Sequence, residues 1–220
     1  GDKPALAMGR ARLQSLLAYL LLHRHARQSR QHLAFLLWPN SPETQARSNL
    51  RKTIYHLRRS LPDAGTYLCI DAHSIQWRPD TCFTLDVAAV EETGGRADAG
   101  GRADSAILRT ALEGAVALYQ GDLLPSCYDD WILPERERLR QQFLEALARL
   151  MRLLEDQRDY ARAMHYANHL LRYDPLHEDT YRRLMRRHAL GDDRAGALRV
   201  YHACTTLLRR ELGVEPGLET

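Results

Sequence analysis

Apolar residues recur at the spacing of buried helical faces in the first part of the chain. In residues 10–23 the leucines follow one another at three- and four-residue steps, which is typical of a helix with one buried side. A second helix is expected over residues 30–37, with Ser29 as its N-cap. It ends before Trp38-Pro39, because a residue that precedes proline avoids helical dihedral angles.

The third predicted helix, residues 42–61, separates an apolar stripe from a polar and basic face. Ser41 is expected to be its N-cap, with Pro42 and Glu43 in the first turn. At about 100° per residue, four apolar side chains fall within one narrow wedge: Leu50, Ile54, Leu57 and Leu61. The other side carries hydrogen-bonding and cationic groups: Ser48, Lys52, Tyr55 and Arg59, with Gln45, Asn49 and His56 beside them and Arg47, Arg51 and Arg58 at the flank. No acid lies on that face beyond the first turn.

Two short alternating segments, residues 67–70 and 74–77, predict strands joined at Asp71-Ala72-His73. Three helices followed by a hairpin is the order of a winged helix-turn-helix. Residues 1–80 are therefore expected to form a winged-helix domain with a small β-hairpin wing.

Helical patterns dominate the remainder of the chain. The expected elements are a short helix at 84–92, a low-complexity loop at 94–104, and helices at 105–120, 130–157, 159–173, 177–190 and 192–212. Asp129 or Asp130 is expected to cap the helix at 130–157. Five aromatic side chains at helical spacing are interpreted as packing residues: Trp131, Tyr160, Tyr166, Tyr181 and Tyr201.

A repeat of 34 residues runs through the last four of these helices. Seven residues of its first copy fall at the small-residue and proline positions of a tetratricopeptide unit: Leu147, Leu150, Met151, Tyr160, Ala163, Ala167 and Pro175. The second copy repeats much of this pattern with Tyr181, Leu184, Met185, Ala197 and Tyr201. The fold class is thus expected to be mainly α, a winged helix followed by an all-α, tetratricopeptide-like domain over residues 81–220 that binds a partner.

The net charge changes sign between residues 1–80 and the remainder of the chain. Residues 1–80 hold 12 Lys and Arg against five acidic residues, a net charge of +7, whereas the remainder holds 19 against 23, a net charge of −4. This asymmetry indicates an anion-binding first domain. No signal segment or membrane-length apolar run is present, and the four cysteines are never paired at CxxC spacing, so we expect a cytoplasmic protein without a structural metal.

The sequence contains no recognisable motif of a catalytic site. The acidic cluster at residues 129–137 lacks a nearby histidine pair, and His177-Glu178 lacks the second histidine of a zinc protease motif. The glycine-rich stretch at 94–101 lacks the Lys-Ser/Thr ending of a phosphate loop. We therefore expect neither an enzyme nor a bound cofactor.

Several motifs together resemble the Streptomyces antibiotic regulatory protein class of bacterial activators, which join an OmpR-like winged helix to a bacterial transcriptional activator domain. The motifs are LLAYLLLH (16–23), LLWP (36–39), QARSNLRKTIYHLRRSL (45–61), LDVAAVE (85–91), YQGDLLPSCYDDW (119–131) and ELGVEP (211–216). The resemblance implies promoter binding at direct repeats of double-stranded DNA and recruitment of RNA polymerase. OmpR-like domains begin with a small sheet, of which only residues 4–8 could be the last strand, so a fragment lacking that sheet is expected.

The resemblance also implies site residues on the third helix. Asn49, Lys52 and His56 are the expected base-reading side chains, since Asn pairs with adenine and Lys donates to guanine. The expected phosphate contacts are Ser48, Arg51, Tyr55, Arg58 and Arg59, of which Arg51 lies at the edge of the face. In the wing, His73 and Arg78 are candidates for groove or phosphate contacts, although an exposed turn carries such residues without any ligand.

Residues 81–220 are left with three candidate roles: dimerisation as a homodimer, polymerase contact or internal regulation. A protein-interaction scaffold whose winged helix does not bind DNA is the alternative function.

Overall fold

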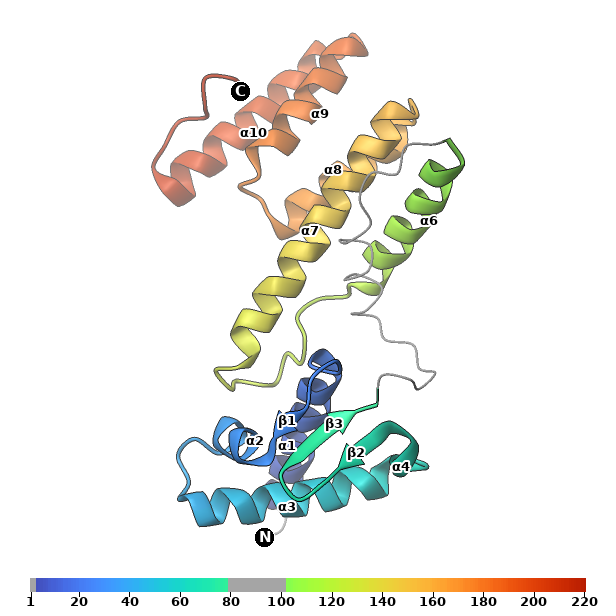
Figure 1. The fold of residues 1–220 in the computed structure, drawn as a ribbon. Coiled ribbons are helices and arrows are strands. Elements are labelled where there is room, and N and C mark those ends of the chain that lie inside the picture. The colour runs from blue at the N-terminus through green and yellow to red at the C-terminus, as the bar shows by residue number, and fades with distance from the viewer. Residues whose placement is uncertain (1–2, 79–101) are drawn as a thin grey trace. The chain divides into compact units, whose positions relative to one another are not determined.

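Three long helices and a small sheet form the first of two compact units. The computed structural model describes residues 3–78 and 102–220. In chain order the first unit contains α1 (Lys3–Leu22), β1 (Gln28–Ser29), α2 (Arg30–Leu37), α3 (Glu43–Ser60), α4 (Ala64–Tyr67), β2 (Leu68–Ile70) and β3 (Ser74–Trp77) (Figure 1). The second contains α6 (Arg102–Leu118), most of α7 (Ile132–Asp156), α8 (Tyr160–Tyr173), α9 (Glu178–Leu190) and α10 (Arg194–Leu212). The prediction of a mainly helical protein is confirmed.

The sheet is antiparallel and has the strand order β1-β3-β2. Its hairpin matches the predicted strands, except that Tyr67 ends the one-turn helix α4 instead of starting β2. β1 is not predicted, because two residues are too few to show an alternating pattern. It exists through pairing with β3, where Gln28 lies opposite Ile75 and Ser29 opposite Ser74.

The hairpin turn is organised by one carboxylate. Asp71 accepts hydrogen bonds from the backbone N–H groups of His73 (2.7 Å) and Ser74 (2.6 Å) and from the Ser74 hydroxyl (2.7 Å). These bonds stabilise the ionised form, the Ser74 hydroxyl bond most of all, and lower the pKa of Asp71 to about 2. The turn therefore depends on a charged Asp71.

The first helix is longer than its apolar pattern indicates. Residues 4–8, expected to be a strand, lie within α1. That expectation was wrong because Ala, Leu and Met are strong helix formers and proline is tolerated in a first helical turn.

The sequence predicts the N-cap of α2 correctly but not that of α3. α2 has its predicted bounds, and the Ser29 hydroxyl accepts from the His32 N–H. α3 begins at Glu43, one residue later than predicted, because Pro42 is itself the extended N-cap and makes no side-chain bond. Ser41 therefore does not cap α3, and its N–H donates instead to the Trp38 carbonyl.

One apolar core holds the first unit together. Its buried members come from every long element of the unit and from the segment that enters α7: Leu16, Tyr19, Leu20, Leu33, Ala34, Leu37, Ala46, Leu50, Ile54, Leu57, Leu68, Ile75, Trp77, Trp131 and Ile132. Trp131 is buried as predicted, but in this core and not among the helices of the second unit, and its ring meets Tyr19 edge-on at 5.2 Å.

The segment 122–137 belongs to the first unit although it follows α6 in sequence. Asp129 fastens it to α1, where it receives hydrogen bonds from Arg12 (2.7 and 2.6 Å) and from the Ser15 hydroxyl (3.1 Å). Arg136 donates to the carbonyls of Leu123, Leu124 and Cys127. The Asp129 carboxylate is thus occupied by α1 and does not cap α7, whose first N–H, of Ile132, bonds the Asp129 backbone carbonyl. The sequence division at residue 80 does not anticipate this return, and the division point lies outside the described residues.

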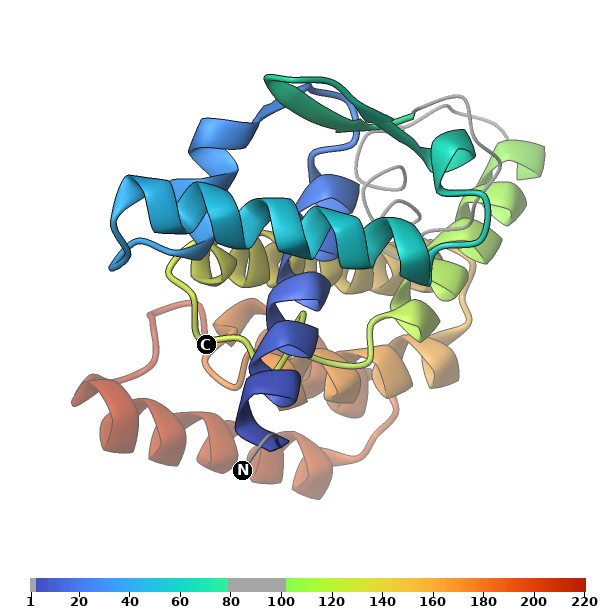
Figure 2. The ribbon, with the colours of Figure 1, turned by 90° about the horizontal axis from the view of Figure 1, so that it is seen from below.

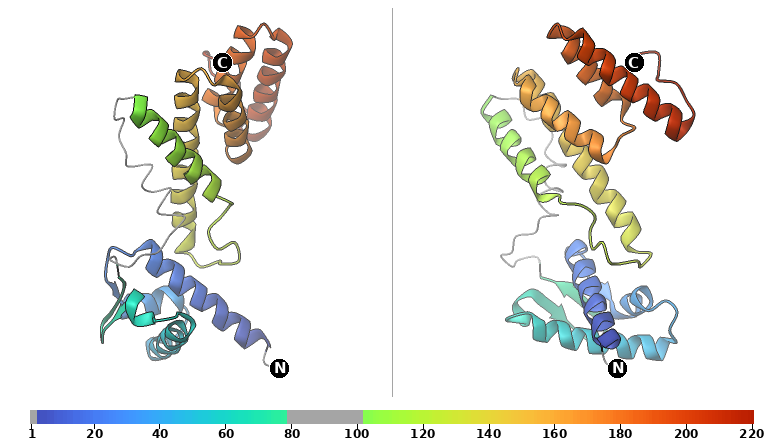
Figure 3. Two further views of the ribbon diagram at one scale, coloured as in Figure 1. Left: turned by 90° about the vertical axis from the view of Figure 1, so that its right-hand side faces the viewer. Right: turned by 180° about the vertical axis from the view of Figure 1, so that it is seen from behind.

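The second unit consists of antiparallel helices that pack on α7. Its main core joins residues of α6, α7, α8 and α9 around Phe143, Leu147 and Leu150, and the small Ala163 and Ala167 are buried in it as the repeat predicts. α9 and α10 lie side by side in both views of Figure 3. α6 begins at Arg102, so residues 102–104 are helical and not part of the expected loop, because a composition signal does not locate a helix start. The predicted helix at 84–92 and the rest of that loop lie outside the described residues.

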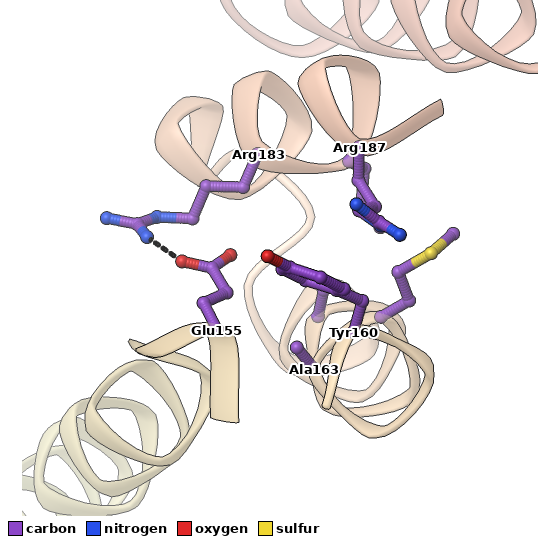
Figure 4. Close-up of a pocket in the computed structure, with 8 residues that line it drawn as sticks. Glu155, Tyr160, Ala163, Arg183 and Arg187 are labelled. Atoms are coloured by element: carbon purple, nitrogen blue, oxygen red, sulfur yellow. Dashed lines mark hydrogen bonds and ion pairs between the residues drawn. The ribbon is translucent and has the colours of Figure 1, made fainter. Parts of the chain in front are cut away.

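A cluster of charged and aromatic groups joins α7, α8 and α9 (Figure 4). Arg183 of α9 bonds Glu155 of α7 at 2.7 Å, and the Arg187 guanidinium stacks 3.7 Å above the Tyr160 ring of α8. Asp179 is the main cause of the raised pKa of Arg183. Of the aromatic residues predicted to pack, Tyr181 is buried and Tyr160 and Tyr166 are half-buried, whereas Tyr201 is 36% exposed.

Replacing Asp129 by Asn is expected to lower the free energy of unfolding by about 2 kcal/mol, because the charged hydrogen bonds from Arg12 weaken in a half-buried place. Urea denaturation followed by circular dichroism measures this. The adjacent exposed Asp130→Asn variant is the control and should change stability by less than about 0.5 kcal/mol. Equal effects of the two substitutions would contradict the fastening role.

The hairpin turn should resist acid. Because the folded pKa of Asp71 lies below its unfolded value, its stabilising contribution is present above pH 4 and is lost as the pH falls through about 2. Carboxyl-detected NMR titration should place the Asp71 midpoint near pH 2, with the His73 and Ser74 amides still protected at pH 3. A midpoint near 4 would show that the turn bonds do not form.

Candidate nucleic-acid interface

Helix α3 is held with one side in the core and the other in solvent. Leu50, Ile54 and Leu57 are buried against α1 and α2, as the apolar wedge predicts, while Leu61 is half-buried. Full burial of a leucine contributes about 1.5–3 kcal/mol, so this stripe determines the rotation of the helix about its axis. In Figure 2 α3 lies in front of α1, with its outer surface toward the viewer.

The outer side of α3 presents the polar and cationic residues that the sequence predicts. Lys52, Tyr55 and His56 are exposed, and Ser48 and Asn49 are half-buried at its first turns. Arg51, Arg58 and Arg59 are exposed along the flank. The structure thus brings all eight predicted helix residues to the solvent-facing side of α3.

Few of these groups are engaged within the protein. The Gln45 amide donates to the Asn49 side-chain oxygen at 2.8 Å, and Arg59 donates to the Tyr55 hydroxyl at 3.2 Å. Arg47 pairs with Glu43. Within the described residues, Arg51, Lys52 and Arg58 make no ion pair and no hydrogen bond through their side chains. Their charge is therefore available to an anionic ligand.

A hollow opens between α3 and the sheet. Its lining combines four arginines with a tyrosine and two isoleucines: Arg30, Arg51, Ile54, Tyr55, Arg58, Arg59 and Ile70. The cationic groups come from two helices, because Arg30 is the first residue of α2. We refer to this site as the arginine hollow.

Arg30 is a candidate site residue that the sequence does not single out. Its backbone N–H donates to the His73 carbonyl (2.9 Å) and its guanidinium to the Asp71 carbonyl (3.0 Å), so the hairpin turn holds it in place. Only the pairing of β1 with β3 brings the start of α2 to this turn, and β1 has no detectable sequence signal.

The two predicted wing residues are exposed but lie apart. His73 belongs to the turn, whereas Arg78 follows β3 at the open end of the hairpin, where its N–H bonds the Tyr67 carbonyl. The whole of β3 separates them, so they cannot share one contact. Only His73 lies at the end of the hairpin that approaches α2.

The described part of the chain contains no cluster of three or more His, Cys, Asp or Glu side chains arranged to hold a metal ion. In the same residues no helix is long and apolar enough to cross a membrane.

Comparison with known proteins identifies the family to which the second part of the chain belongs. Residues 85–220 match the family model of the bacterial transcriptional activator domain. The chain is 29% identical over 216 residues to the regulatory protein AfsR of Streptomyces coelicolor and 26% identical over 226 residues to the transcriptional regulatory protein MoaR1 of Mycobacterium tuberculosis. The fold is similar to that of Mycobacterium tuberculosis EmbR, solved in complex with a low affinity phosphopeptide, with a TM-score of 0.72 at 18% identity.

The chain matches a different fraction of the length of each of these proteins. The matches cover 98%, 96% and 95% of this chain, but 22% of AfsR, 70% of MoaR1 and 56% of the EmbR chain. The chain therefore spans only part of the length of AfsR and of EmbR.

Substitution on the two sides of α3 should separate stability from surface function. Leu50→Ala should reduce the free energy of unfolding by about 2–5 kcal/mol, since it leaves a cavity in the core. Lys52→Ala, two residues away and exposed, should change it by less than about 0.5 kcal/mol. Thermal and urea unfolding measure both, and a large loss from Lys52→Ala would mean that α3 is oriented differently.

Proposed function

This chain belongs to the bacterial transcriptional activator domain family, and from that premise we propose that it is a sequence-specific DNA-binding activator of the Streptomyces antibiotic regulatory protein type. Residues 1–80, together with the returning segment 122–137, form a winged-helix DNA-binding unit. The remaining helices form a tetratricopeptide-like domain. Both relatives compared by sequence are regulatory proteins, and MoaR1 is a transcriptional one.

The outer face of α3 is the observation that carries the proposal. The major groove admits an α-helix, and this helix presents cations without internal partners and no acid past Glu43. A scaffold that had no nucleic-acid ligand would gain nothing from leaving these charges unpaired. DNA supplies the missing anions.

Base reading is assigned to Asn49, Lys52 and His56. The Asn49 oxygen already accepts from Gln45, which orients the amide, and its second lone pair and both N–H donors stay available for adenine. Ser48, Tyr55 and the flanking arginines contact phosphates and position the helix without reading sequence. His73 and Arg78 make separate wing contacts.

As the family resemblance implies, the second unit contacts RNA polymerase and the protein binds at promoter direct repeats. Contact with a second copy of the chain is the other role considered for this unit. Its paired helices provide a surface of the kind that stacked helical repeats use for proteins. We assign the chain no catalytic activity and no cofactor.

DNA binding is tested by fluorescence anisotropy with a promoter library in graded salt. The logarithm of the association constant should fall linearly with the logarithm of salt concentration, because phosphate contacts release counterions. Lys52→Ala should lose about 1–3 kcal/mol of discrimination at one base position. Arg58→Ala should weaken binding equally on all sequences and reduce the salt slope by about 0.9.

Arg194→Ala is the matched control, since it removes an exposed arginine from the second unit. It should leave affinity and slope unchanged. If binding depended neither on salt concentration nor on the two α3 substitutions, the proposed function would be wrong. If the protein bound a protein partner tightly and had no affinity for DNA, the scaffold function would hold instead.

A further inference from the structure

The arginine hollow has a composition that α3 alone does not explain. Three of its guanidinium groups come from one face of α3, but the fourth, Arg30, comes from α2 and is held by the hairpin turn. Ile54 and Ile70 supply apolar lining, and Tyr55 supplies a hydroxyl. Residues of α2, α3 and β2 thus line one hollow that contains four arginines.

No acid in the described residues forms an ion pair with Arg30, Arg51, Arg58 or Arg59. Asp71 carries a negative charge in the nearby turn, but its carboxylate accepts its hydrogen bonds from His73 and Ser74 and forms no ion pair with these arginines. Like charges held together beside apolar lining repel one another, and a bound anion would remove that cost.

The donor chemistry fits a phosphodiester. A guanidinium has five N–H donors in a planar arrangement. In Arg30 one of them donates to the Asp71 carbonyl, and the others remain available to a ligand. The backbone N–H groups at the start of α2 are already taken, since Arg30 donates to His73 and His32 to Ser29. Recognition therefore falls to the side chains and not to the helix terminus.

We propose that the arginine hollow clamps one backbone phosphate of bound duplex DNA and that Arg30 is a phosphate-positioning residue of the interface. This assignment rests on the proposed function. Arg30 binds this phosphate from α2 while Arg58 binds a neighbouring one from α3, so the two contacts together fix the angle at which α3 enters the groove. The clamp reads no base, and its contribution is the same on every sequence.

The test measures anisotropy of the tightest promoter duplex and of an unrelated duplex of equal length in graded salt. Arg30→Gln should lower the salt slope by about 0.9 on both duplexes, the value for one lost phosphate contact. Arg30→Lys should keep the slope but weaken binding, because the fork is lost and the charge is not. Arg10→Gln removes an exposed arginine of α1 outside the hollow and should match wild type.

A second arm alters the DNA as well as the protein, and its wild-type measurement does not depend on whether a variant folds. Each phosphate of the promoter duplex is replaced in turn by a neutral methylphosphonate. One position should reduce the wild-type slope, and Arg30→Gln should show no further loss there, since both changes remove the same contact. Additive losses at every position, or an Arg30→Gln slope equal to wild type, would overturn the clamp. Failure of wild-type protein to bind any duplex would instead overturn the proposed function.

Discussion

Burial of the Leu50, Ile54 and Leu57 stripe is the constraint on which the rest of the first unit depends. Three large side chains leave water together, and because they repeat at helical spacing they can do so in only one rotation of α3. That rotation places Lys52, Tyr55 and His56 in solvent. The interface is therefore a consequence of the core: the same 18-residue helix cannot bury its apolar side without presenting its cations outward.

A second constraint keeps α1 in position behind that stripe. The segment 122–137 returns from the far end of α6 and inserts Trp131 and Ile132 into the first core, while Asp129 binds Arg12 and Ser15. The unit is thus closed by residues that lie more than a hundred positions from α1 in sequence, as the separation of 117 between Arg12 and Asp129 shows. The chain cannot be divided at a single point into two units, because the first unit takes part of its core from the start of α7.

How well the sequence predicts each feature follows from the range of the interactions that form it. The bounds of α2 and the stripe of α3 are correct, because capping and helical periodicity act within a few residues. β1, the role of Asp129 and the position of Arg30 are missed, since each depends on a partner far along the chain: β3, α1 and the hairpin turn, respectively. The helix at residues 4–8 is missed for a different reason, because an expectation from the resemblance displaced a clear local preference for helix.

Arginine content alone does not single out α3, and the lack of carboxylate partners at four neighbouring arginines is the more specific feature. In the second unit Arg182, Arg183, Arg209 and Arg210 each lie within 3.3 Å of a carboxylate, so their charges stabilise contacts between and along helices. On α3 and at the start of α2, Arg30, Arg51, Arg58 and Arg59 have no such partner among the described residues. An exposed ion pair contributes little to stability, so omitting acids from this face costs the fold almost nothing. It leaves the charge of the guanidinium groups available to the phosphates of the proposed DNA ligand.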